Sequence, residues 1–170
     1  TVINNNFIFG DGHPFAGGLR IADDGHTITN NYIEKARYKD TSHHGGIVIL
    51  GYDGAGDGDN GYQQVENVHI AHNTIVDSVN SVNIDGGDKS DTPKKVYFAN
   101  NIIDRAVGDV FVDTERGVTS DSAYAGNIVY GSGDLADSDS VSASDLGATF
   151  IAAMLEKGSD GLYRSGDNSP

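Results

Sequence analysis

Residues 28–33 read Ile-Thr-Asn-Asn-Tyr-Ile, and the chain repeats this pattern four more times. The other copies are Ile3-Asn4-Asn5-Asn6-Phe7-Ile8, Ile70-Ala71-His72-Asn73-Thr74-Ile75, Phe98-Ala99-Asn100-Asn101-Ile102-Ile103 and Tyr124-Ala125-Gly126-Asn127-Ile128-Val129. One asparagine column runs through all five copies, at spacings of 25, 42, 28 and 26 residues: Asn6, Asn31, Asn73, Asn101 and Asn127. Ordinary loops do not place aliphatic or aromatic residues on both sides of each Asn five times, so the pattern indicates a repetitive fold.

A second series of short pieces lies between these copies and alternates with a period of two, which is typical of strands with one buried face. The pieces are centred on Arg20, Val48, Asn83 and Phe111, and we expect these four residues to form an outward row. Short strands in a repeat of about 25 residues predict an all-β parallel β-helix whose coils stack at about 4.8 Å. We expect about five coils over residues 1–131, with the asparagines as a hydrogen-bonded ladder at one corner. Asn also tolerates the left-handed backbone that a sharp bend requires.

The repeat fades after residue 131. Residues 132–145 are rich in Ser and Asp, and residues 146–157 carry apolar side chains at helical spacing: Phe150, Ile151, Met154 and Leu155. The sequence therefore predicts a short C-terminal helix over the end of the coils, within an extension (132–170) of the same domain. At the other end, the first strand pattern starts at Val2 with nothing before it to cover the coil. We therefore hypothesise that the chain is the rear part of a longer β-helix.

The composition restricts the class of partner. The chain has 23 Gly, 21 Asp and 14 Asn but no Cys, and its formal net charge is -14. Nonspecific binding to nucleic acid or to an anionic membrane requires clustered positive charge, so we expect neither partner. No apolar run approaches the length of a membrane span. The absence of Cys excludes a disulfide framework and a thiolate metal site.

The few positive charges are nonetheless gathered together. Residues 1–50 hold 4 basic and 5 acidic residues (net -1), whereas residues 51–170 hold 7 and 20 (net -13). Six cationic or titratable side chains fall within 25 residues: Arg20, Lys35, Arg37, Lys39, His43 and His44. A locally cationic face on an acidic protein suits an anionic sugar, so we take these residues, with Asn83, as candidate substrate contacts. Residues 35–39 also fit a solvated turn.

One Gly- and Asp-rich segment is a candidate metal site. Asp53, Asp57 and Asp59 offer closely spaced oxygen ligands of the kind that calcium prefers. Their spacing does not match the twelve-residue calcium loop, and the same residues also fit a turn that uses Asp and Gly for their backbone conformations.

Several of these stretches together resemble polysaccharide lyase family 6, which contains alginate lyases and chondroitinase B. They are Gly17-Gly18-Leu19-Arg20-Ile21, then residues 25–34, 46–49 and 60–68, and the resemblance runs from about Thr1 to Arg105. It implies a right-handed parallel β-helix, secreted or periplasmic, that cleaves an acidic polysaccharide by β-elimination. In such enzymes calcium neutralises the uronate carboxylate, a Lys takes the C5 proton and an Arg assists departure of the O4 group. Arg20 matches a substrate-contacting Arg of the alginate lyases.

The chain departs from the family in one respect. The family's catalytic Lys and Arg and its acidic calcium ligands lie on coils before the segment that here begins at Thr1, so no catalytic residue of this chain is expected by family match. Either those coils belong to a partner chain or a removed segment, or this is a noncatalytic β-helix that serves as a carbohydrate-binding or surface scaffold. Ice binding would require a regular Thr array, and the outward row is too mixed for that.

Overall fold

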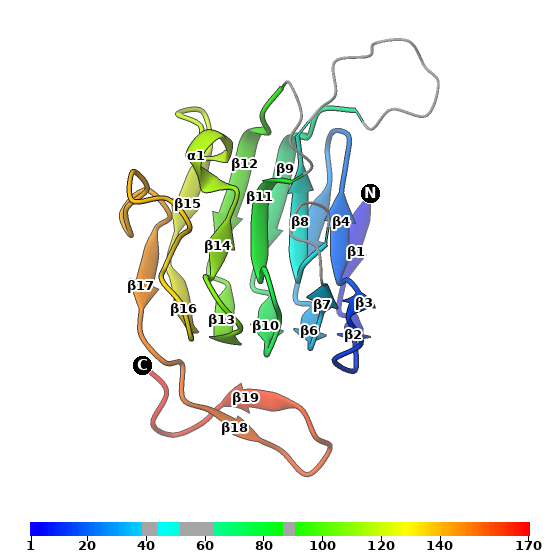
Figure 1. Ribbon diagram of the computed structural model, residues 1–170. Helices are drawn as coiled ribbons and strands as arrows, with labels where there is room; N and C mark the ends of the chain where they lie inside the picture. Colours follow the sequence, from blue (N-terminus) through cyan, green and yellow to red (C-terminus); the bar gives the residue numbers. More distant parts are fainter. Residues whose placement is uncertain (39–43, 52–62, 87–90) are drawn as a thin grey trace.

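The computed structural model describes residues 1–38, 44–51, 63–86 and 91–170, and it consists almost entirely of short parallel strands (Figure 1). Sheet 1 contains β1 (Val2–Asn4), β5 (Thr27–Thr29), β9 (Glu66–Ala71), β12 (Lys94–Ala99) and β15 (Ala123–Ala125). Sheet 2 contains β2 (Phe7–Phe9), β6 (Tyr32–Glu34), β10 (Thr74–Val76), β13 (Ile102–Ala106), β16 (Asn127–Gly131) and β17 (Ala148–Phe150). Sheet 3 contains β4 (Leu19–Ile21), β8 (Ile47–Leu50), β11 (Val82–Gly86) and β14 (Phe111–Val112). Neighbouring strands of each sheet come from successive coils, so the predicted parallel β-helix is confirmed.

The core is built from columns of like side chains, because the coils stack in register. The column of sheet 1 contains Ile3, Ile28, Ile70, Phe98 and Tyr124. The column of sheet 2 contains Ile8, Ile33, Ile75, Ile103 and Val129. Within these columns Ile28, Ile33, Ile70, Ile75, Phe98 and Ile103 are fully buried. The alternation of apolar residues in the sequence thus becomes one continuous apolar interior.

The asparagine column forms the expected ladder between sheets 1 and 2. The side-chain amide nitrogen of Asn31 donates to Oδ1 of Asn73 at 2.9 Å, and that of Asn73 donates to Oδ1 of Asn101 at 3.0 Å. Each of these nitrogens donates a second bond to a backbone carbonyl of the preceding coil, Asn73 for example to Ile28 at 3.0 Å. The ladder therefore satisfies polar groups that the coil corner buries.

The left-handed residue at this corner is the one before each ladder asparagine. Positive φ values of 54° to 63° occur at Asn5, Asn30, His72, Asn100 and Gly126. The bend and the ladder are thus made by adjacent residues, which explains why Asn-Asn pairs recur in the sequence.

Residues 146–157 do not form the predicted helix, and this prediction is wrong. Ala148–Phe150 pair with β16 as strand β17, and Leu155–Lys157 form β18, which pairs antiparallel with β19 (Tyr163–Ser165). The free edge of sheet 2 offers unpaired backbone groups, and β17 satisfies them, as in the bond from the Ile151 amide to the Val129 carbonyl at 2.9 Å. Stacking also continues past residue 131 in sheet 3, where Ala136 bridges Phe111.

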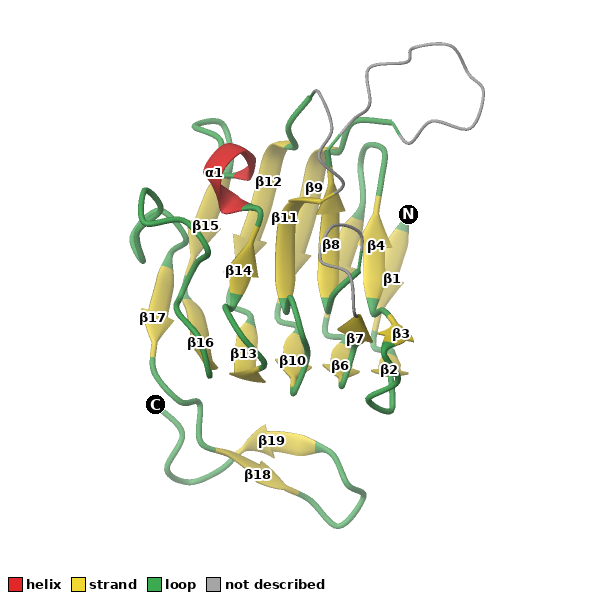
Figure 2. Cartoon of the chain, viewed as in Figure 1, coloured by secondary structure: helices red, strands yellow, loops and turns green. Residues whose placement is uncertain are grey.

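The remaining described elements are small. β3 (Phe15–Ala16) pairs antiparallel with β7 (Arg37–Tyr38), and the four-residue helix α1 (Thr114–Gly117) follows β14 (Figure 2). Asp137 caps α1 from the next coil, because its carboxylate accepts the Thr114 amide at 3.2 Å and the Asp113 amide at 2.6 Å. No helix in the described part of the chain has the length and apolar character needed to cross a membrane.

Candidate functional site

A hollow of about 260 Å³ opens on the outer face of sheet 3, at its first two strands. Its lining consists of Gly17, Gly18, Leu19, Arg20, His44, Gly45 and Val48. Arg20 lies at the centre of β4 and is exposed, while Leu19 and Ile21 on either side of it turn toward the interior. The strand alternation therefore holds a guanidinium at the surface, a group whose planar fork of N–H donors matches anionic oxygens.

Glycines let the coils approach closely beside Arg20. A Cβ on Gly18 would overlap the carbonyl oxygen of Gly46, and one on Gly45 would overlap the carbonyl oxygen of Asn80. The same backbone is hydrogen-bonded across the coils, from the Gly18 amide to the Gly45 carbonyl at 2.8 Å. Only glycine allows this approach, and the resulting lack of side chains leaves the hollow open.

The half-buried ring of His44 forms one side of the hollow. Its Cδ2 lies 3.5 Å from the position that a Cβ on Gly17 would take, so the ring packs against the bare backbone there. Arg20 and His44 come from different coils but meet at one hollow. Of the predicted contact residues that the structure describes, these two are the ones it brings together.

The outward row of sheet 3 contains Arg20, Val48, Asn83 and Val112, in register. The prediction that Phe111 belongs to this row is wrong: Phe111 aligns with Val82 and is fully buried. The predicted row was displaced by one residue at β14, and a shift of one residue exchanges the two faces of a strand.

Asn83 lies two strands from Arg20 and is buried. Its side-chain nitrogen donates to Oδ2 of Asp113 at 2.7 Å, just before α1. Nearby, Arg116 of α1 forms an ion pair with the buried Asp85 at 3.3 Å. These contacts hold α1 against β11, so this end of the face is a closed polar cluster rather than an open hollow.

The other two predicted cations that the structure describes, Lys35 and Arg37, do not line the hollow. Lys35 lies at a left-handed corner after β6, with its Nζ 3.4 Å from Oε1 of Glu34. Arg37 lies on β7, opposite Ala16 of β3. Both follow from the path of the chain, which leaves sheet 2 at residue 35 and reaches sheet 3 only at residue 47.

Several predicted residues fall outside the described ranges. These are Lys39 and His43 among the cations, and Asp53, Asp57 and Asp59 of the candidate calcium site. Within the described ranges, no group of three or more His, Cys, Asp or Glu side chains could hold a metal ion.

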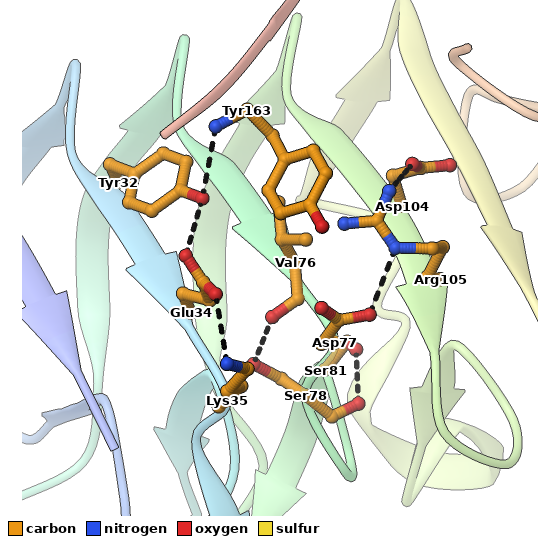
Figure 3. A network of polar contacts seen from close by, with 10 residues as sticks. All are labelled: Tyr32, Glu34, Lys35, Val76, Asp77, Ser78, Ser81, Asp104, Arg105 and Tyr163. Atoms are coloured by element: carbon orange, nitrogen blue, oxygen red, sulfur yellow. Dashed lines mark hydrogen bonds and ion pairs between the residues drawn. The ribbon is translucent and has the colours of Figure 1, made fainter. Parts of the chain in front are cut away.

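The sequence did not reveal a polar network on the outer face of sheet 2 (Figure 3). Tyr32 donates its hydroxyl to Glu34 at 2.7 Å, and the Arg105 guanidinium binds Asp77 at 2.9 Å and Asp104 at 3.0 Å. Burial, and then the hydrogen bond to Glu34, raise the pKa of Tyr32 well above its ordinary value, so its hydroxyl stays a donor. A signal was present: charged residues recur three and four positions after the ladder asparagines, as in residues 34–35 and 104–105.

The fold resembles those of solved polysaccharide lyases. Alginate lyase AlyGC of family 6 matches with a TM-score of 0.69 and 22% identity over 98% of this chain and 22% of the other. Alginate lyase AlyF-OU02 in complex with G6 matches with a TM-score of 0.69 and 20% identity over 99% of this chain and 38% of the other. A mannuronic acid specific family 6 lyase from human gut microbiota matches with a TM-score of 0.64 and 24% identity over 89% and 34%.

The chain thus spans between 22% and 38% of the length of these lyases. No curated protein sequence matches it significantly. The sequence model of the Chondroitinase B family matches residues 1–127, which is most of the chain and includes the ladder, the Gly17-Gly18 and Gly45-Gly46 pairs and Arg20. The chain therefore belongs to the Chondroitinase B family.

Proposed function

We propose that this chain is the part of a polysaccharide lyase that holds an acidic, uronate-containing polysaccharide, alginate above all, on the outer face of sheet 3. The observation that carries the proposal is the exposed Arg20 at a hollow that the glycines leave open. A guanidinium matches a carboxylate in shape and charge, and it stays protonated at every working pH. His44 on the opposite wall supplies a ring that can donate to a hydroxyl or carboxylate oxygen.

The charge distribution supports an anionic ligand at this place. The net charge of residues 1–50 is only -1, and Arg20 belongs to that segment, whereas most of the excess acid lies later in the chain. A polyanion approaching sheet 3 at β4 therefore meets much less repulsion than one approaching the C-terminal coils.

We propose further that this chain by itself binds but does not cleave. β-Elimination requires a base that takes the C5 proton while the C4–O4 bond breaks, the C4–C5 double bond forms and the departing oxygen gains a proton. Lys35, the described lysine closest in sequence to the hollow, is turned toward Glu34 at 3.4 Å and does not line the hollow. The base and acid would then come from coils outside this sequence, as the family resemblance implies.

The proposal includes calcium binding, because the family resemblance implies it. Asp53, Asp57 and Asp59 are its candidate ligands, with a role in neutralising a uronate carboxylate. Calorimetric titration of the wild type with calcium chloride, beside a triple Asp→Asn variant at these positions, tests this. Equal heats from both proteins would exclude these three residues as ligands.

Binding of alginate oligosaccharides, measured by calorimetry, tests the main proposal. Arg20→Ala should weaken binding by roughly tenfold to a hundredfold, because a hydrogen-bonded charge contact contributes about 1.5–3 kcal/mol. Arg20→Lys should recover only part of the loss, since a lysine cannot bind a carboxylate through two parallel bonds. The matched control is Arg164→Ala, which removes another exposed arginine, one that is paired with Asp160 in the C-terminal hairpin.

Two outcomes would contradict the proposal. If Arg20→Ala bound alginate as the wild type does, Arg20 would not be a ligand contact, and a scaffold without a sugar site on this face would be favoured. If the purified chain alone generated the ultraviolet absorbance of an unsaturated uronate from alginate or chondroitin sulfate, a complete catalytic set would have to lie within it. Lys35 or Lys39 with Arg37 would then be the residues to substitute first.

A further inference from the structure

The outer face of sheet 2 is covered by an antiparallel hairpin, although the residues beneath it are polar. The hairpin consists of β18 and β19 and lies across the strands of sheet 2, apart from the stacked coils (Figure 1). Beneath it, Tyr32 is 7% exposed, Glu34 5% and Asp104 3%. Outward-facing carboxylates on a β-helix are ordinarily hydrated, so their burial needs a cause.

Tyr163 ties the hairpin to the coils. Its backbone amide donates to the Tyr32 hydroxyl at 3.3 Å. Its ring packs against the Arg105 guanidinium, whose Cζ atom lies 3.9 Å from the ring centroid. Figure 3 shows the Tyr163 ring between Tyr32 and Arg105. Lys157 lies 5.2 Å from the same ring centroid, on the other strand of the hairpin. The ring therefore contacts one cation of the coils and one cation of the hairpin.

The coils hold the receiving groups in place without help from the hairpin. Asp77 and Asp104 form ion pairs with the guanidinium of Arg105 and hold it in place. The side chain of Asp77 is 24% exposed and that of Asp104 is 5% exposed. Glu34 is bonded to Tyr32 and lies 3.4 Å from the Lys35 ammonium. Because every one of these contacts lies within the coils, the receiving surface stays assembled when the hairpin leaves.

Few interactions hold the hairpin against the coils. Its two strands pair with each other through three residue pairs, and within the described part of the chain neither pairs with a coil strand. A two-stranded hairpin is marginally stable on its own. Docking also places the Tyr163 ring over the charged guanidinium of Arg105 and removes water from it, which opposes closure.

We infer that the β18–β19 hairpin is a detachable clasp, latched by the Tyr163 ring on Arg105, which opens as a unit while the coils remain folded. Opening hydrates Glu34 and Asp104 and exposes the Tyr32 ring beside the half-exposed Phe7 and Phe9, which already contact it at centroid distances of 6.3 and 5.9 Å. The clasp acts on sheet 2, whereas the Arg20 hollow lies on sheet 3, so it does not depend on the proposed polysaccharide site.

Hydrogen exchange of the full chain, followed by mass spectrometry, tests this inference. Tyr163→Ala should speed exchange in residues 155–165 by about tenfold, since it removes the cation–π contact that latches the hairpin. Exchange in β10 and β13 should stay as in the wild type. Tyr163→Phe keeps the ring and should behave as the wild type, which separates the latch from a general effect of substitution.

The matched control lies one residue away. Arg164→Ala removes an exposed side chain that binds Asp160 within the hairpin at 2.6 Å, so it should leave the closed population within about twofold of the wild type. Unchanged exchange of residues 155–165 in Tyr163→Ala would overturn the latch. Loss of protection in β13 together with the hairpin would overturn the clasp, because the hairpin would then belong to the cooperative core.

Ionisation of Tyr32 supplies a second measurement. Burial is the largest cause of the raised pKa of its hydroxyl, and the bond from the Tyr163 amide lowers that pKa by less, so opening the clasp should on balance move it down toward its ordinary value. A tyrosine-selective carbon label read by NMR follows this group in Tyr163→Ala and in the wild type. An equal Tyr32 pKa in the two proteins would mean that the hairpin does not cover it.

Discussion

The side-chain nitrogen of Asn127 donates to the backbone carbonyl of Leu146 at 3.2 Å, where earlier coils offer the carboxamide oxygen of another asparagine. The ladder thus ends on a main-chain acceptor. The amide of Asn127 likewise donates to the carbonyl of Gly147 at 2.9 Å. The last asparagine keeps all its partners although no sixth asparagine follows, so the ladder does not leave buried donors at its end.

A central member of the ladder should be far more important for stability than the first member. Asn73→Ala removes the acceptor of both the Asn31 amide and the Asn31 side chain, and these groups are buried. Each unsatisfied buried group costs about 1–3 kcal/mol, so we expect a loss of roughly 3–5 kcal/mol in urea unfolding. Asn6→Ala is the control: Asn6 is exposed and its loss should cost less than about 1 kcal/mol. Equal losses for both variants would refute a cooperative ladder.

Glycine at position 18 is required by contact between coils. A Cβ there would overlap the Gly46 carbonyl oxygen, which belongs to the backbone and cannot move aside alone. Gly18→Ala should therefore destabilise the chain by roughly 3 kcal/mol or more, measured by thermal and urea unfolding. Gly17→Ala is the neighbouring control, because its Cβ would make only ordinary van der Waals contacts, the nearest at 3.5 Å from the His44 ring. We expect little loss there, and a stable Gly18→Ala protein would show that the two coils can separate at this contact.

The cap on α1 comes from another coil. Asp137 accepts the amides of Asp113 and Thr114 and also the Thr114 hydroxyl at 2.7 Å. Asp137→Ala should lower the free energy of unfolding by about 1–2 kcal/mol, in the range of a lost helix cap. Asp139→Ala, an exposed change two residues away, controls for the loss of one negative charge. A larger loss in Asp139→Ala than in Asp137→Ala would contradict the cap.

The hairpin ion pair should be visible in an acid titration. The hydrogen bonds from Arg164 hold the pKa of Asp160 at about 2, below its ordinary value. Since the folded value is lower than the unfolded one, this pair stabilises the folded chain above pH 4 and the stabilisation disappears as the pH falls toward 2. An NMR titration of the Asp160 carboxyl gives its midpoint directly. Arg164→Ala should move that midpoint up toward the ordinary value, and an unchanged midpoint would exclude the pair.

The sequence predicted those features whose signal repeats. The ladder asparagines appear five times with apolar neighbours, so both the coils and the buried corner could be inferred from the sequence alone. The position of Arg20 followed from the same alternation. Phe111 was misplaced because β14 has only two residues, and two residues cannot establish a register by alternation alone.

Pairings and contacts that occur only once in the chain could not be predicted from a repeating pattern. The apolar spacing of Phe150, Ile151 and Met154 fits a helix, but the open edge of sheet 2 gives these residues strand partners that local spacing cannot reveal. The contact between Tyr163 and Tyr32 spans 131 residues and occurs once. No periodic pattern marks such a contact, so only the folded chain discloses the clasp.

The ladder bond from Asn6 to Asn31 spans 25 residues and the bond from Asn31 to Asn73 spans 42, yet both measure 2.9 Å. The distance between two ladder residues therefore depends on the number of coils between them and not on the number of residues. A dozen or more residues can be added between two sheets without displacing Arg20 from its neighbours on the next coil. A lineage of such proteins is therefore free to change the length of its loops while the spacing of the groups on each sheet stays the same.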